Sequence, residues 1–161
     1  VPNMRTTHYT AAQGGGEVPY RQYPGTDLTT YGYLYDYYAA TKLSRSMPAQ
    51  VQGICPDGWH IPDDEDFADL MAHYDAPMLM TTEHWLTPGT NTSGFSAEPA
   101  GIYNPESGRF EYLYVTTYLW SYTPTPSVFH ACQFGSQCGT LEIEPTSGEF
   151  GYSVRCVHNE E

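Results

Sequence analysis

Cysteine and histidine are the residue types in this chain best suited to metal or redox chemistry. The four cysteines are Cys55, Cys132, Cys138 and Cys156. A structural zinc site needs pairs of closely spaced cysteines, and only Cys132 and Cys138, with His130 beside them, come near that pattern. We therefore expect no metal and no cofactor. An even number of cysteines indicates metal binding or catalysis in a cytosolic enzyme, but disulfide bridges in a secreted domain. A local Cys132–Cys138 bridge is sterically feasible.

The acidic run Asp63, Asp64, Glu65 and Asp66 resembles a cation site at first sight. Its spacing lacks the alternating ligands of a calcium loop. Acidic side chains stabilise the start of a helix, because they accept hydrogen bonds from its unpaired backbone amides and interact favourably with the helix dipole. We interpret this run as the start of a helix that occupies about residues 63–74.

Signals of an enzyme are missing from the sequence. The chain contains neither a Gly-x-Ser-x-Gly nucleophile motif nor a phosphate-binding glycine loop, so we predict that it is not an enzyme. Nineteen acidic residues against six basic ones give a net charge of −13, which would repel nucleic acid and anionic membrane surfaces. No apolar run is long enough for membrane insertion. Fifteen tyrosines suit either a recognition surface or a β-rich core.

The predicted secondary structure is two helices followed by short strands. A first helix is expected over residues 35–43, and the second begins at Asp63, with Phe67, Leu70, Met71 and Tyr74 on one face. Turn residues and alternation predict strands at residues 101–103, 109–114, 118–122, 128–134, 140–144 and 151–157. Residues 1–30 are rich in glycine and proline and are predicted to be loop. This order is typical of an α+β fold, and 161 residues favour one domain over 1–161.

Five sequence blocks resemble the Fibrobacter succinogenes major paralogous domain family. In order, they are Tyr-Gly-Tyr-Leu-Tyr-Asp-Tyr-Tyr-Ala-Ala (31–40), Cys-Pro-Asp-Gly-Trp-His-Ile-Pro (55–62), Gly-Phe-Ser-Ala (94–97), Leu-Trp-Ser (119–121) and Gly-Tyr-Ser-Val-Arg-Cys-Val (151–157). This family occurs on secreted and surface-anchored bacterial proteins, and its fold is similar to the C-type lectin-like fold. The resemblance implies two helices packed on short, mostly antiparallel sheets, and a disulfide between Cys55 and Cys156. It also implies that His60 makes a structural hydrogen bond.

The N-terminus is shorter than the family pattern, because the strand that usually precedes the Asn-Met-Arg-Thr block is absent or shortened. We see no signal peptide before Val1. If the strand is lost by processing, an exposed sheet edge could accept a strand from a neighbouring subunit.

The resemblance to lectin-like folds also implies a ligand surface just before the last strand, at residues 119–139. The candidate ligand-binding residues there are Trp120, Tyr122, Phe129, His130, Gln133, Phe134 and Gln137. Alternation puts Tyr118, Trp120 and Tyr122 on one face, and Trp120 suits the core equally well. The calcium-dependent sugar motifs of true C-type lectins are absent.

These observations favour a secreted or cell-surface (outer-membrane exposed) recognition or adhesion domain that binds a glycan or protein ligand. An alternative hypothesis is a structural subunit of an extracellular filament or pilus. A minor alternative is an oxidase resembling the formylglycine-generating enzymes, which would require Cys132 or Cys138 to be a reactive thiol.

Overall fold

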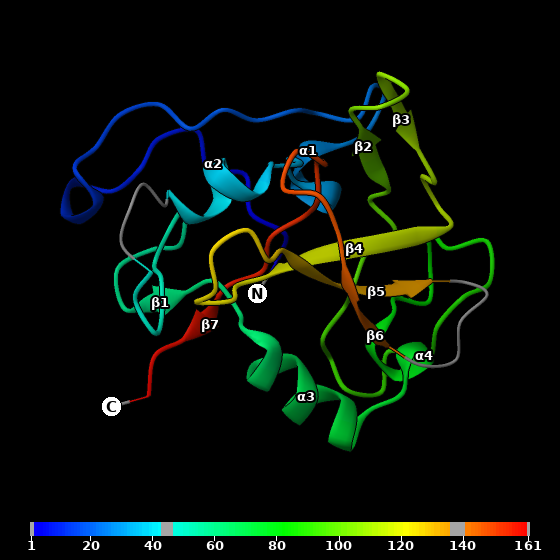
Figure 1. Ribbon diagram of the computed structural model, residues 1–161. Coiled ribbons are helices and arrows are strands. Elements are labelled where there is room, and N and C mark those ends of the chain that lie inside the picture. The colour runs from blue at the N-terminus through cyan, green and yellow to red at the C-terminus, as the bar shows by residue number, and fades with distance from the viewer. Residues whose placement is uncertain (1, 43–46, 136–140, 161) are drawn as a thin grey trace.

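The computed structural model describes residues 2–42, 47–135 and 141–160 (Figure 1). Its helices are a 3-10 turn at Ala11–Gln13, α1 (Leu28–Tyr31), α2 (Tyr37–Thr41), α3 (Asp64–His73) and α4 (Ala76–Leu79). Its strands are β1 (Trp59–His60), β2 (Ile102–Asn104), β3 (Arg109–Glu111), β4 (Thr116–Ser121), β5 (His130–Gly135), β6 (Glu142–Pro145) and β7 (Val157–His158). Helices and small antiparallel sheets in this arrangement form an α+β fold, as the sequence predicts.

The central sheet has the strand order β4-β5-β6, and all its pairs are antiparallel. The closing segment of the chain extends this sheet beyond β4, because Leu119 bridges Ser153 and Tyr152 bridges Tyr35. The segment after β6 first continues the pairing with β5, because the amide of Thr146 donates to the carbonyl of Phe129, and then runs toward α1 (Figure 1).

The two faces of the central sheet pack against different helices. On one face, Trp120 and Ala131 join a core cluster with Tyr37 of α2. On the other face, Leu119 and Phe134 join a second cluster with residues of α3 and α4, and α2 and α3 lie on opposite sides of β4 in Figure 1. Strand alternation produces this division, since successive side chains of a strand point to opposite faces.

Helix α3 begins where the acidic run predicts. Asp63 is the N-cap, and its side chain accepts from the amide of Asp66 while the Asp66 side chain accepts from the amide of Asp63. This capping box satisfies two amides that the helix itself leaves unpaired. The prediction of a helix over residues 63–74 is confirmed to within one residue at each end. The first predicted helix is shorter than expected: α2 is capped by Asp36 and ends at Lys42, which has a left-handed φ of 53°.

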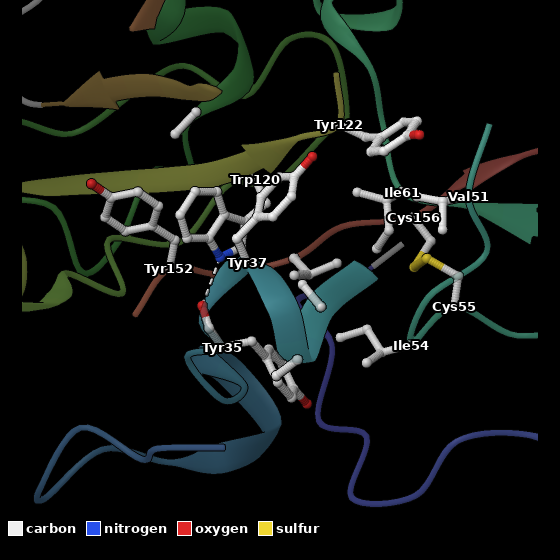
Figure 2. Packing of buried hydrophobic residues seen from close by; sticks show 14 of the residues in the cluster. Tyr35, Tyr37, Val51, Ile54, Cys55, Ile61, Trp120, Tyr122, Tyr152 and Cys156 are labelled. Carbon is white, nitrogen blue, oxygen red and sulfur yellow. Dashed lines mark hydrogen bonds between the residues drawn. A yellow bond between two sulfur atoms is a disulfide. The ribbon is translucent and has the colours of Figure 1, made fainter. Parts of the chain in front are cut away.

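The Cys55–Cys156 disulfide is present, with 5.8 Å between the two Cα atoms and a separation of 101 positions along the chain. It lies at the edge of the larger core cluster (Figure 2). In that cluster the indole Nε1 of Trp120 donates to the carbonyl of Tyr35 at 2.6 Å. The bridge thus joins the segment before β1 to the closing segment, as the family resemblance implies.

Two regions differ from the sequence prediction. The short helices α1, capped by the side chain of Asp27, and α4 are absent from the sequence prediction. The predicted strand over residues 151–157 is interrupted: its first part forms isolated bridges at residues 151–153, and only its end, β7, pairs with β1. The hairpin formed by β2 and β3 agrees with prediction.

Candidate functional site

Three of the predicted ligand-binding residues belong to the core. Trp120, Tyr122 and Phe134 are 0%, 1% and 0% exposed. The assignment of these three side chains to a ligand surface is therefore wrong. Residues 118, 120 and 122 do share one face, as alternation predicts. On that face, helix α2 and Tyr152 pack against Trp120 and join it and Tyr122 in one core cluster, so these two side chains are buried.

Phe129 and His130 lie on opposite faces of β5. Phe129 packs edge-on against Tyr37 and Tyr38, with ring centroids at 4.9 and 5.8 Å. The Nδ1 atom of His130 lies 2.7 Å from a carboxylate oxygen of Asp64, at the start of α3. These two predicted residues therefore do not converge on one ligand.

Cys132 is buried and carries a thiol. Because its predicted partner Cys138 lies outside the described residues, the Cys132–Cys138 bridge stays a prediction. Burial, and to a smaller extent the nearby Asp64 carboxylate, raises the pKa of the Cys132 thiol to about 12. A thiol in such surroundings is almost entirely protonated at neutral pH and is a weak nucleophile. Cys138 and the predicted ligand residue Gln137 lie outside the described residues.

Gln133 is the predicted residue that the structure places at the centre of an open surface. It lies on β5 between Tyr118 of β4 and Glu142 of β6, in direct cross-strand register with both. Residues in such register point to the same face, with Cβ atoms about 5 Å apart. Tyr118 and Gln133 are partly exposed and Glu142 is exposed. We call these three residues, together with Glu144, the sheet row.

The polar end of the sheet row contains two neighbouring carboxyl groups. The pKa of Glu144 is raised, first by burial and then by the charge and hydrogen bonding of Glu142. A proton shared by such a pair is held more firmly than by a single carboxyl group. The pair therefore offers both hydrogen-bond acceptors and, when protonated, a donor.

The aromatic end of the sheet row is fixed by Tyr152. The rings of Tyr118 and Tyr152 are stacked, with centroids 4.8 Å apart and planes 17° apart. The Tyr152 hydroxyl and the Thr146 hydroxyl are 2.7 Å apart. Burial raises the pKa of Tyr152 to about 12. The Tyr118 ring is thus held in place from beneath before any ligand arrives.

On the opposite face of the sheet, an apolar cavity of about 340 Å³ lies between α3 and the closing segment. Phe67 and Leu70 of α3, Phe95, Leu119 and Val157 form its apolar walls. Arg155 lies at its edge, while Asp66 and Asp69 line the side toward a neighbouring acidic hollow.

One of the carboxylates beside this cavity, that of Asp66, has structural partners. Asp66 accepts from the amide of Asp63 and lies 3.0 Å from Nε2 of His60, whose Nδ1 is 2.7 Å from Asn159. The structural hydrogen bond predicted for His60 is therefore confirmed. Among the described residues, no group of three histidine, cysteine, aspartate or glutamate side chains is arranged as metal ligands would be.

Residues 3–158 match the family model of the Fibrobacter succinogenes major domain. The chain belongs to this family. No curated protein and no solved structure matches it significantly. In the part of the chain that the structure describes, no helix is both long enough and apolar enough to cross a membrane.

In this member of the Fibrobacter succinogenes major domain family, sequence reasoning missed Glu142, Glu144 and the cavity. The two glutamates alternate with Leu141 and Ile143, a pattern that identifies a strand but not its neighbour. The cavity has no sequence signal, because its walls come from α3, from Phe95 and from the closing segment.

Proposed function

We propose that this chain is a secreted or cell-surface bacterial recognition domain of C-type lectin-like fold. It binds a glycan or protein ligand through the sheet row and does so without catalysis. The observation that carries this proposal is the alignment of Tyr118, Gln133 and Glu142 across three adjacent strands.

The chemistry of the row suits an uncharged, hydroxyl-rich ligand. A tyrosine ring packs against the apolar face of a sugar, while an amide and a carboxylate bind its hydroxyl groups. The neighbouring carboxyl groups of Glu142 and Glu144 disfavour an anionic ligand at the row, so a neutral glycan is the preferred class. Because Tyr118 is already stacked on Tyr152, it loses less side-chain conformational entropy when a ligand binds.

An extracellular location is supported by the Cys55–Cys156 disulfide, because such bridges persist in oxidising compartments. The lectin-like fold is supported by helices on both sides of a small antiparallel sheet and by the bridge to the closing segment. The alternative of a thiol oxidase is disfavoured by the burial and raised pKa of Cys132.

The test is a binding screen of the purified chain on a broad glycan array, in calcium and in chelator. We expect neutral glycans to bind in both buffers, since the row needs no metal. Tyr118→Ala and Gln133→Ala should each weaken binding at least about tenfold. Tyr74→Ala is the matched control, because Tyr74 is an exposed tyrosine that lines the cavity on the α3 side.

Two results would count against the proposal. Equal binding by Tyr118→Ala and the native chain would exclude the sheet row as the site. A hit that chelator abolishes would place the site at carboxylates that hold calcium. If no glycan binds, the proposal of a glycan ligand fails. The sheet row would then stand as a binding site only if the native chain captured a protein ligand that Tyr118→Ala did not capture.

A further inference from the structure

The cavity between α3 and the closing segment is lined almost entirely by carbon. Its volume of about 340 Å³ is within the range of small-molecule sites and has room for roughly ten water-sized groups. Phe67 and Leu119 form its buried floor, and Leu70 and Phe95 are partly exposed. Burying an apolar body of this size would remove that surface from water, which favours binding.

Arg155 is a buried cation that lines this apolar cavity and also a second hollow, which contains Glu98 and His84. Arg155 is 5% exposed. Its guanidinium donates to Asn3 Oδ1 at 2.7 Å and to the carbonyls of Phe95 and Ser96 at 2.5 and 2.7 Å, and it lies 4.7 Å from the centre of the Phe95 ring. These bonds use three of the five N–H groups that a guanidinium carries.

All three acceptors of Arg155 are neutral oxygens. Among the described residues, no carboxylate lies within ion-pair distance of it, and Glu98, which is near enough to influence its charge, instead contacts His84 at 2.9 Å. Buried charges are normally paired, because removing a charge from water is costly. Burial lowers the pKa of Arg155 to about 10, so the group is still cationic at neutral pH.

We propose that this cavity binds a small apolar monocarboxylate, with its carboxylate on the Arg155 guanidinium and its hydrocarbon body against Phe67, Leu70 and Leu119. The anion supplies the charge partner that Arg155 lacks, and the cavity supplies the apolar surface. Asp66 and Asp69, which also line the cavity, repel a second negative charge and therefore disfavour dicarboxylates. This site lies on the opposite face of β4 from the sheet row and does not depend on the function proposed for that row.

The test is calorimetric titration of the intact chain with 3-phenylpropionate and with 3-phenylpropanamide. The two probes have nearly the same shape, but only the first is an anion. We expect 3-phenylpropionate to bind with a Kd in the range of about 0.01–1 mM, and the amide to bind roughly 10- to 100-fold more weakly. Equal affinity for both probes, or no binding of 3-phenylpropionate, would overturn the proposal.

Two tryptophan variants of α3 locate the site without disturbing Arg155, whose loss would also weaken the fold. Leu70→Trp places a larger side chain in the cavity and should abolish binding of 3-phenylpropionate. Ala72→Trp puts the same side chain at an exposed position of the same helix and should leave the Kd unchanged. Binding that survives in Leu70→Trp would show that the probe lies elsewhere. Tyr118→Ala should also leave this Kd unchanged, which separates the cavity from the sheet row.

Discussion

The sheet row and the cavity lie on opposite faces of one strand. Tyr118 belongs to the row and Leu119, the next residue, lines the cavity. The row is at least partly exposed to solvent and mostly polar. Its aromatic ring, that of Tyr118, is held in place because it stacks on Tyr152. The cavity is half-open and mainly apolar, and one of its lining residues is the buried Arg155, whose hydrogen bonds go to neutral oxygens.

The difference shows how one sheet can support two kinds of recognition. In the row, side chains of neighbouring strands lie side by side because their residues are paired in register. The pairing of β4, β5 and β6 therefore determines this surface. In the cavity, the walls come from segments far apart in the chain, so its shape depends on how α3 and the closing segment are held together. The row meets the closing segment through the stack of Tyr118 on Tyr152, whereas Arg155, Cys156 and Val157 of that segment form part of the cavity wall. Loosening the closing segment should therefore weaken the cavity more than the row.

Removing the disulfide is the largest expected perturbation of this comparison. The double change Cys55→Ser, Cys156→Ser opens a loop of about 100 residues and should lower the free energy of unfolding by about 4–5 kcal/mol. Cys156 also lines the cavity, so at a temperature where the variant is still folded, 3-phenylpropionate should lose more affinity than a glycan at the row. Thermal unfolding and titration measure both effects.

The control for the disulfide variant is Cys132→Ala, which removes a buried cysteine but leaves the bridge. It should be destabilised by only about 1–2 kcal/mol. Equal losses of affinity at both sites in the double variant would show that the cavity and the row depend on the bridge alike.

Alkaline pH should weaken the support of the row. Burial raises the pKa of Tyr152 to about 12, above the ordinary tyrosine value of about 10. A raised pKa means that the stabilisation is fully present below pH 10 and is lost as the pH rises through 12. The loss from Tyr152 is on the order of 2 kcal/mol. Tyr152→Phe has no hydroxyl to ionise, so its stability should fall less between pH 9 and pH 12 in urea unfolding experiments. Parallel curves for the two chains would contradict this account.

The sequence predicted the elements that local chemistry determines. Helix α3 was predicted because Asp63 and the acidic first turn stabilise a helix start, and the β2–β3 hairpin because its turn residues are unambiguous. The Cys55–Cys156 bridge came from the family resemblance. Helices α1 and α4 were missed because each is a single turn without a repeating apolar pattern.

The candidate site was predicted less well, because alternation identifies a face but not what covers it. Trp120 and Tyr118 share a face, yet Trp120 is buried by α2 and Tyr152 while Tyr118 stays partly exposed. Which residues are covered depends on contacts between segments far apart in the chain, such as that of Tyr37 in α2 with Trp120, and no local pattern specifies these contacts. Arg155 could be noticed in the family motif, but its lack of an acidic partner is visible only in three dimensions.

The smallest expected effect concerns His130, which the sequence grouped with Gln133 but the structure places on the opposite face of β5. His130→Ala removes its contact with Asp64 at the start of α3, a partly exposed pair worth no more than about 1 kcal/mol. Glycan binding by the row should be unchanged, because His130 does not point to that face. Denaturant unfolding and the glycan screen measure the two quantities. Loss of glycan binding in His130→Ala, with stability retained, would mean that the ligand reaches around the sheet edge and that the row alone does not define the site.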